Sequence, residues 1–493
     1  RAVAMLHSFW YEAAEKSFRA VADADPGCAM AYWGVAMSLY HPIWPDRPPL
    51  DKGLAAVEKA KAIGAKTDRE KAYIGAITEY YAGAGGPDYK ARAQTYEKAM
   101  ERVYRAFPQD REAAAFYAVA LLWTLSYAPA DQTNPRKAAA VLDKIADEMP
   151  RHPGVLHYYI HAYDSPQLAP LALKAAQSYA KVAPAVPHAL HMPSHIFTRL
   201  GLWQDSIDSN IASAAAARDY AKKSGMPGAW DQELHALDYL AYAYLQRGDD
   251  AKAREVLVRI AEVRSSEPAS MVAAYALSAI SVRYAVEAHR WEEAARLEPM
   301  PAAFPWDRFP IGQAMLRLGR ALGLARTGDR AGARKEVDAL QSLHDAMPEA
   351  GGYNWKEQVE ILRREAAGWL AQAEGNPQEA EKLLRSAAQL EDSTEKNAVT
   401  PGPITPAREM LGELLLDQKN PGGALIEYEA ALRLTPNRFN GLSGAARAAE
   451  LAGNRVKAKE YYAKLVSVAD GGSKRPELAA ARTFLARNET AAK

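Results

Sequence analysis

The chain has 493 residues, 49% hydrophobic and 25% charged, a composition that supports a folded core and excludes a disordered protein. Its 61 Lys and Arg residues nearly balance its 60 Asp and Glu residues, and the net charge of +1 gives no general attraction to nucleic acid or to an anionic membrane. The single cysteine, Cys28, excludes an internal disulfide and a thiolate metal cluster. At about 150 residues per domain the length suits three domains or one repeat array, and we expect no nucleic-acid partner.

The sequence predicts a soluble protein without a membrane span. The longest uncharged run covers residues 113–130, contains Ser126 and Pro129, and falls short of the about 20 strongly apolar residues that cross a bilayer. The chain begins at Arg1 rather than at Met. This start, together with the single thiol, favours a periplasmic or secreted protein, with the cytoplasm as the alternative.

Apolar residues recur at helical spacing through most of the chain. Near the start they stand at Ala14, Phe18 and Val21, and further on at Ala253 and Leu257. Recurrence at i, i+3 and i+4 is typical of amphipathic helices, and few segments alternate with the period of two that marks a strand. The sequence therefore predicts helices nearly everywhere.

A longer repeat joins these helices into pairs, with a small residue that opens the second helix and a proline twelve positions later. The pattern starts at Ala14, Ala138, Ala172 and Ala424, with prolines at Pro26, Pro150, Pro184 and Pro436. Ala138, Ala172 and Ser206 follow one another at intervals of 34 residues. Gly-Asp or Gly-Asn pairs, such as Gly248-Asp249, mark the tight turn between two helices.

This spacing resembles the tetratricopeptide repeat, which has a period of about 34 residues, and the chain is similar to bacterial members of that superfamily. The resemblance implies an all-α fold, a right-handed α-solenoid of about a dozen helical pairs. We expect N-terminal repeats over residues 1–118, central repeats over 119–262 and C-terminal repeats over 263–493. The Pro-rich residues 41–45 and the four-proline stretch 298–310 are expected to be irregular joints.

The resemblance also implies that the first helix of each pair lines a concave groove, at positions about 18, 15, 11 and 8 residues before the small residue. In the middle of this chain those positions carry mostly histidines and aromatic residues. They are Trp123, Tyr127, His157, His161, Asp164, His188, His191, His195, His235, Asp238, Tyr242 and Arg283. The centre of the groove is therefore predicted to be rich in histidine.

Histidines concentrate in one stretch, since six of the 11 lie within residues 152–195. His157 and His161 form an H-x3-H pair, and His191 and His195 repeat it 34 residues later. Histidines four apart on a helix lie about 5–6 Å apart, so two pairs could bring their nitrogens to about 2.0–2.1 Å from one metal ion. Nitrogen ligands without thiolates favour zinc or copper, with nickel and iron as alternatives.

We therefore predict a transition-metal site. Its candidate ligands are His157, His161, His191, His195, His188 and His235. Pro193 interrupts the second H-x3-H pair, and a helix is expected to begin there, which would leave His188 and His191 on an entering loop. If the ion keeps an open position that activates water or dioxygen, Asp164 and Asp238 are the candidate acid/base groups.

Aromatic and basic groove residues are predicted to hold a small-molecule or peptide ligand. They are Trp123, Tyr127, Tyr242 and Arg283. Two alternatives stay open: a non-catalytic adaptor that binds a peptide or protein partner in the groove, and histidines with a purely structural role. His7 is expected to be structural and His152 to be solvated in a turn. Motifs of nucleotide-binding enzymes, serine hydrolases and zinc proteases are absent, which leaves those classes without support from the sequence.

Overall fold

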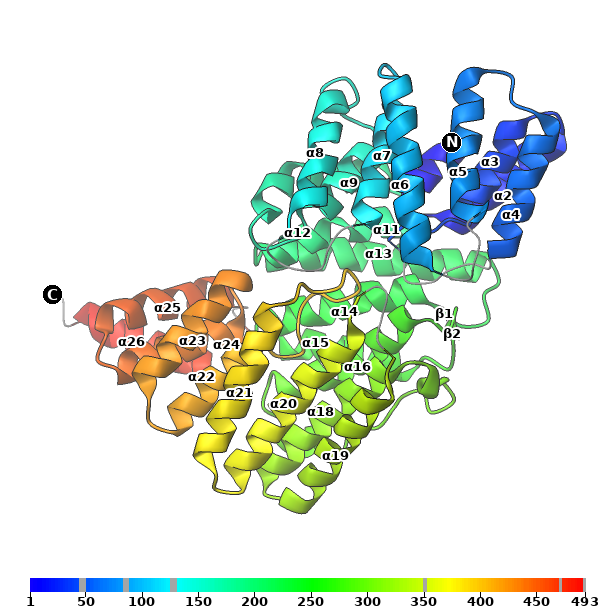
Figure 1. Ribbon diagram of the computed structural model, residues 1–493. Coiled ribbons are helices and arrows are strands. Elements are labelled where there is room, and N and C mark those ends of the chain that lie inside the picture. Colours follow the sequence, from blue (N-terminus) through cyan, green and yellow to red (C-terminus); the bar gives the residue numbers. More distant parts are fainter. Residues whose placement is uncertain (44–49, 83–87, 125–130, 349–352, 470–471, 491–493) are drawn as a thin grey trace. The chain divides into compact units, whose positions relative to one another are not determined.

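The computed structural model describes residues 1–43, 50–82, 88–124, 131–348, 353–469 and 472–490, and in these ranges the regular secondary structure is almost entirely helical (Figure 1). The all-α fold predicted from the sequence is therefore confirmed. Within the same ranges the regular strands are two short ones, β1 (Ala229–Trp230) and β2 (Ser266–Glu267), which pair in parallel. No helix of the described chain combines the length and the hydropathy needed to cross a bilayer.

The chain forms two compact units. The N-terminal unit comprises Arg1–Asp164 and Leu168–Ile196, and the C-terminal unit comprises Ser165–Gln167 and Phe197–Lys493. The three groups of repeats expected over residues 1–118, 119–262 and 263–493 stay a prediction. The division into two units falls where the helices are short and where Pro187 and Pro193 each begin a new one, because proline cannot continue a preceding helix.

In the N-terminal unit, helices that follow one another in the chain pack against each other as hairpins. The helices are α1 (Ala2–His7), α2 (Tyr11–Ala24), α3 (Ala29–Ser38), α4 (Leu50–Ile63), α5 (Asp68–Ala82), α6 (Tyr89–Ala106), α7 (Arg111–Trp123), α8 (Thr133–Ala146), α9 (Pro153–Tyr163), η1 (Ala169–Ala172), α10 (Leu173–Val182), α11 (Pro187–His191) and α12 (Pro193–Arg199), which continues into the other unit. Aromatic rings fill the core between them. Trp33 packs edge to face on Tyr73 and Phe116, with ring centroids 5.7 and 5.6 Å apart.

The C-terminal unit continues the same arrangement, and Figure 1 shows α18 to α21 side by side. Its helices are α13 (Trp203–Lys223), α14 (Asp231–Gln246), α15 (Asp250–Ala261), α16 (Met271–Val286), α17 (Trp291–Ala294), η2 (Trp306–Arg308), α18 (Pro310–Thr327), α19 (Arg330–Ala346), α20 (Trp355–Ala373), α21 (Pro377–Asp392), α22 (Ala407–Asp417), α23 (Pro421–Leu434), α24 (Phe439–Leu451), α25 (Arg455–Val468) and α26 (Pro476–Thr490). The backbone between α17 and α18 is irregular, as expected for the four-proline stretch.

The small residues of the repeat lie at the contacts between paired helices. At most 1% of each is exposed: Ala14, Ala138, Ala172, Ser206, Ala253, Ala333, Ala380, Ala424 and Ala458. A side chain of this size lets two helices approach closely, and larger neighbours fill the space around the contact. The stacking of helical pairs predicted from these positions is therefore confirmed.

The turns between helices depend on a glycine and the polar residue after it. Gly328 has a φ of 92°, a left-handed conformation in which the chain leaves α18, and the Asp329 side chain accepts a hydrogen bond from the Gly332 N–H at 2.8 Å as the cap of α19. The same roles recur at Gly248-Asp249, Gly375-Asn376 and Gly453-Asn454. The expected Gly-Asp and Gly-Asn turns are thus confirmed.

Two glycine positions allow the effect of backbone conformation on stability to be measured separately from side-chain packing. A Cβ at Gly328 or at Gly422, in the first turn of α23, would meet no atom within 4 Å. We expect Gly328→Ala to lower the free energy of unfolding by about 1–2 kcal/mol, because a Cβ is disfavoured in the left-handed region. Gly422→Ala should instead raise it by up to about 1 kcal/mol, since alanine favours a helix. Urea denaturation of both variants checks this, and equal losses in both would contradict it.

Candidate metal centre

Five of the predicted ligands lie on three helices of the N-terminal unit. They are His157 and His161 on α9, His188 and His191 on α11, and His195 on α12. Pro187 and Pro193 are the first residues of α11 and α12, where a missing backbone N–H leaves no hydrogen bond unmade. The helix start predicted at Pro193 is confirmed. His188 and His191, expected on a loop, lie in a short helix of their own.

Three imidazoles converge at their Nε2 atoms. The Nε2 of His157 lies 3.0 Å from that of His161 and 3.2 Å from that of His188. All three nitrogens lie within 4.8 Å of one another. His157 and His188 are buried and His161 is half-buried. The three rings therefore have the spacing of ligands around a single ion, and we refer to them as the histidine triplet.

The hydrogen bond made by the Nδ1 atom of His157 determines which of its two ring nitrogens carries the proton. Nδ1 lies 2.7 Å from the backbone carbonyl oxygen of His7, which can only accept, so Nδ1–H donates and Nε2 keeps its lone pair. Burial lowers the pKa of His157 to about 3, against the opposing effect of this hydrogen bond. The ring is therefore neutral and presents an unprotonated nitrogen to His161 and His188.

Hydrogen bonds alone do not explain why two other Nε2 atoms lie so close to the Nε2 of His157. An imidazole nitrogen has one lone pair in the ring plane, so the Nε2 of His157 cannot accept a proton from both neighbours at once. A metal ion instead takes one lone pair from each ring. Two nitrogens at about 2.0–2.1 Å from one ion are about 3.0–3.4 Å apart for bond angles of about 95–110°, which matches the 3.0 and 3.2 Å separations. The triplet therefore fits a transition-metal ion.

His191 and His195 form a second pair, with their Nε2 atoms 3.0 Å apart. At the end of α9 the Asp164 Oδ2 accepts a hydrogen bond from the His195 Nδ1–H at 2.9 Å, which leaves the Nε2 lone pair of His195 for a ligand. The ring centroids of His161 and His195 are 6.3 Å apart, as are those of His188 and His191. The pair therefore adjoins the triplet, and Asp164 orients one of its rings.

Phe9 covers the triplet. Its ring centroid lies 4.4 Å from that of His157, 5.6 Å from that of His161 and 5.5 Å from that of His188. The backbone of Phe9 has a φ of 52°, a left-handed conformation that costs a residue with a side chain about 1–2 kcal/mol. Phe9 thus adopts an unfavourable backbone conformation at the position where its ring covers the three imidazoles. No spacing in the sequence links Phe9 to the histidines, so the sequence alone did not identify it.

A hydrogen-bonded group behind the triplet involves His7, Glu112 and His152. The two oxygens of Glu112 accept hydrogen bonds from the Nε2 atoms of His7 at 2.7 Å and His152 at 3.1 Å. The Nδ1 of His7 accepts from the Tyr158 hydroxyl at 2.9 Å, and that of His152 accepts from the Val155 N–H at 3.3 Å. Both rings therefore have a donor and an acceptor partner without an ion. The solvated position expected for His152 is wrong, since its side chain is 8% exposed.

The charge state of this group depends on burial and hydrogen bonding. Burial alone would raise the pKa of Glu112, but the hydrogen bonds from His152 and His7 outweigh it and hold the pKa well below its usual range. Burial lowers the pKa of His7 more than Glu112 raises it. A neutral His7 is thus fixed by an ionised carboxylate, and its carbonyl in turn holds His157. The group anchors the triplet.

Asp238 and Arg283 belong to the C-terminal unit, on α14 and α16, and pair with each other. The Arg283 guanidinium also donates to the Gly402 carbonyl oxygen at 2.6 Å and to the Thr400 hydroxyl at 3.0 Å. Burial raises the pKa of Asp238 to about 6, although Arg283 opposes the shift. Both side chains are therefore engaged within the fold, and their predicted acid/base and ligand-holding roles stay predictions.

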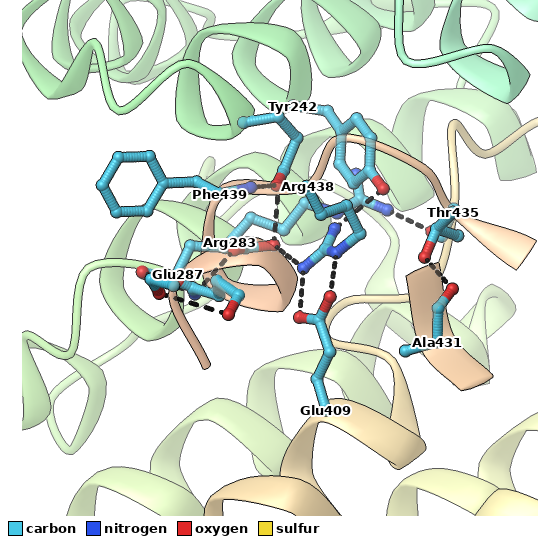
Figure 2. A network of polar contacts seen from close by, with 12 residues as sticks. Tyr242, Arg283, Glu287, Glu409, Ala431, Thr435, Arg438 and Phe439 are labelled. Atoms are coloured by element: carbon cyan, nitrogen blue, oxygen red, sulfur yellow. Dashed lines mark hydrogen bonds and ion pairs between the residues drawn. The ribbon is translucent and has the colours of Figure 1, made fainter. Parts of the chain in front are cut away.

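Tyr242 takes part in a neighbouring network (Figure 2). Its hydroxyl lies 2.8 Å from the Nη1 of Arg438, and the same guanidinium donates to Glu287 at 2.7 Å and to Glu409 at 2.8 Å. All four side chains are buried. Tyr242 is thus a partner of a buried arginine, and any contact with a ligand stays a prediction.

Three further residues were predicted, namely Trp123, His235 and Tyr127. Trp123 is half-buried in the N-terminal unit and packs edge to face on Tyr40, with ring centroids 4.5 Å apart. His235 belongs to the C-terminal unit and lies edge-on to Tyr239, with centroids 5.3 Å apart. Tyr127 lies outside the described residues.

No protein-family model and no curated protein matches the chain. Among solved structures, the chain is similar to the human IFIT1 dimer with m7Gppp-AAAA, at 15% identity and a TM-score of 0.40, with 90% of each chain covered. It is also similar to the APC/C hetero-tetramer Cut9-Hcn1, at 12% identity and a TM-score of 0.30, with 99% of this chain and 94% of that chain covered. Scores this low say nothing about function, which has to come from the residues of this chain.

Proposed function

We propose that this helical-repeat protein binds a transition-metal ion between His157, His161 and His188. The observation that carries the proposal is the convergence of their Nε2 atoms, with the lone pair of His157 directed at the other two rings. Three neutral nitrogen ligands without a thiolate suit zinc and copper best, and nickel and iron(II) next. Oxygen-seeking calcium and magnesium do not suit such a site.

The adjoining pair of His191 and His195 extends the proposal to a second ion. Its two nitrogens are 3.0 Å apart, and Asp164 fixes the tautomer of His195 as carboxylates do behind metal-bound histidines. The cluster would then hold one ion in the triplet with higher affinity and another at the pair with lower affinity, because the pair offers fewer protein ligands within the unit.

The number of protein ligands favours a metal-dependent enzyme over a structural metal site. Three protein ligands leave one position of a tetrahedral ion open, which is typical of catalytic rather than structural zinc. An ion with an open position lowers the pKa of a bound water or polarises a substrate oxygen. In this proposal the chemistry takes place at the ion, and Asp164 positions His195.

Titration of metal-free protein with Co²⁺ tests the proposal, because Co²⁺ occupies zinc sites and absorbs visible light in a way that depends on its ligands. We expect intense tetrahedral bands that saturate near one equivalent, followed by a weaker second phase. Adding Zn²⁺ should abolish the bands. Unchanged spectra at all Co²⁺ concentrations would contradict the proposal.

The Asp164→Asn variant should separate the two positions. An asparagine side chain can present an N–H to the His195 ring, which favours the wrong tautomer, so we expect the second phase to weaken by about 10–100-fold. The first phase should keep its affinity, because the hydrogen bond that the variant alters is made to His195 and not to a ring of the triplet. Asp147→Asn, at an exposed position of the same unit, is the matched control. Equal weakening of both phases would show that the variant acts through stability.

A second candidate function is non-catalytic binding of a ligand or partner. A cavity of about 250 Å³ in the C-terminal unit favours it, with Trp291, Trp369, Tyr428, Glu413 and Asp417 among its lining residues. Such binding would persist after treatment with a chelator, whereas binding at the histidines would be lost. Comparing ligand capture with and without chelator separates the two functions.

A further inference from the structure

A smaller cavity, of about 50 Å³, lies in the C-terminal unit against α16, α18, α20 and the segment that leads into α22. It combines acidic and aromatic side chains. The lining residues that matter here are Tyr275, Tyr353, Trp355, Glu365, Glu391 and Thr405. The cavity shares no residue with the histidine cluster, so a ligand bound in it would be independent of the proposed metal site.

Two polar atoms at this cavity have no hydrogen-bond partner within the described chain. Glu365 is only 1% exposed, and its Oε2 is one of them. The hydroxyl of Thr405 is the other. Buried carboxyl and hydroxyl oxygens are nearly always hydrogen-bonded, and leaving one unsatisfied is costly. Both oxygens can accept a hydrogen bond, so a ligand with several donors would satisfy them together.

The second carboxyl group, Glu391, is weakly engaged. Its oxygens lie 3.3 and 3.4 Å from the Ala407 N–H. Burial raises the pKa of Glu391 to about 8 and holds that of Glu365 well above its usual range, and the two groups repel each other when ionised. Both shifts favour the protonated form of the carboxyl groups while the cavity holds no ligand.

The charged groups around the cavity are largely paired with one another. Arg408 pairs with Asp392, and Arg283, which donates to Thr400 and Gly402 of the cavity wall, pairs with Asp238. Asp392 at the end of α21 and Glu409 on α22 raise the pKa of Glu391, and Arg438 opposes them. That arginine is already bonded to Glu409 and Glu287, so its charge is shared among carboxylates. Within the described chain, Glu365 and Glu391 form no ion pair, so they are the carboxyl groups left for a positive charge that enters the cavity.

The remaining wall is aromatic. The ring centroid of Trp355 lies 4.7 Å from that of Tyr353 and 6.0 Å from that of Tyr275. Aromatic faces attract cations, and the attraction grows when the cation is removed from water. Rings and carboxyl groups around one small space are therefore suited to an organic cation.

We propose that this cavity binds a primary ammonium group, with Glu365, Glu391 and Thr405 as its acceptors. An ammonium carries three N–H donors, which matches these three acceptors, whereas the flat guanidinium carries five. A space of about 10–15 Å³ holds one water-sized group, so about 50 Å³ admits an ammonium with a short alkyl stem. The source is either a free alkylamine or a lysine side chain of a partner.

Isothermal titration calorimetry with n-butylammonium and with n-butanol tests the proposal at neutral pH. The two probes have nearly the same size and differ in charge. We expect n-butylammonium to bind and n-butanol not to bind. Because burial favours the protonated form of both carboxyl groups, binding of a cation should release protons, seen as a heat that varies with the ionisation enthalpy of the buffer.

The Glu365→Gln variant should weaken n-butylammonium binding by about 10–100-fold, the size expected for a charge-assisted hydrogen bond. Glu391→Gln is the second variant in case the first fails to fold, which circular dichroism will show. Glu292→Gln, at an exposed position of the same unit, is the matched control. An N-acetylated peptide with one lysine shows whether the ammonium comes from a protein, by binding more tightly than the free amine. Equal binding of both probes, no binding of n-butylammonium at millimolar concentration, or unchanged affinity in both variants would overturn the proposal.

Discussion

Replacing His157 with alanine is expected to leave the protein without stoichiometric metal after desalting. His157 stands between the other two rings of the triplet and is the ligand whose lone pair the His7 carbonyl directs. Altering a hydrogen bond behind a ligand weakens metal binding by about 10–100-fold, so loss of the ligand itself should exceed that range. Metal content by mass spectrometry and competition with a chromophoric chelator measure the effect.

His161→Ala is the companion variant, because His161 is half-buried and its loss threatens folding less than the loss of a fully buried ring. His344→Ala, on α19 of the C-terminal unit, makes the same chemical change at a histidine that is not a predicted ligand and should keep the metal. Retention of metal by His157→Ala and His161→Ala alike would refute the site, as would a wild-type protein that binds no zinc, copper, nickel or iron on reconstitution.

Arg438→Met is expected to destabilise the C-terminal unit by about 3–5 kcal/mol, the usual effect of removing one partner from a buried ion pair. Arg438 is 0% exposed, and its bonds to Glu287 and Glu409 are buried as well. Methionine fills a similar volume but leaves two carboxylates without their cation. Hydrogen exchange measured by mass spectrometry over α16, α22 and α24 reports the loss in this unit separately from the other.

Two further variants make this result specific. Arg330→Met removes an exposed arginine of the same unit and should change the free energy of unfolding by less than about 0.5 kcal/mol. Adding Glu287→Gln and Glu409→Gln to Arg438→Met should restore part of the loss, because no buried charge then lacks a partner. If Arg438→Met is as stable as Arg330→Met, the network contributes nothing measurable.

The helical fold could be predicted from the sequence because its causes are local. A small residue such as Ala138 marks a close helix contact, and Gly328 followed by Asp329 ends one helix and caps the next. Proline acts within one turn of chain, which is why the start of α12 at Pro193 could be predicted correctly.

The candidate site could be predicted where it rests on regular spacing in the sequence, either within one helix or over the 34-residue repeat that placed His188 beside the pair of His157 and His161. The H-x3-H pair of His157 and His161 lies on one helix, so its convergence is a consequence of helical spacing. The contact of His157 with the His7 carbonyl joins residues 150 positions apart in the sequence, and no local sequence pattern predicts it. The surroundings of Arg283 likewise depend on residues far along the chain. The side chain is fully buried, and its guanidinium donates to Thr400 and Gly402 of the segment before α22.

The bond between the His157 ring and the backbone of His7 has a thermodynamic consequence. It couples docking of α1 on α9 to occupancy of the triplet, and such a coupling acts with equal strength in both directions. At a free metal concentration about 100 times the dissociation constant, bound ion can stabilise the docked state by up to about 2.7 kcal/mol. Detachment of α1 would in turn lower the affinity for the metal by the factor by which saturating metal favours the docked state. Amide protons of α1, far along the chain from the ligands, would therefore exchange more slowly when metal is bound.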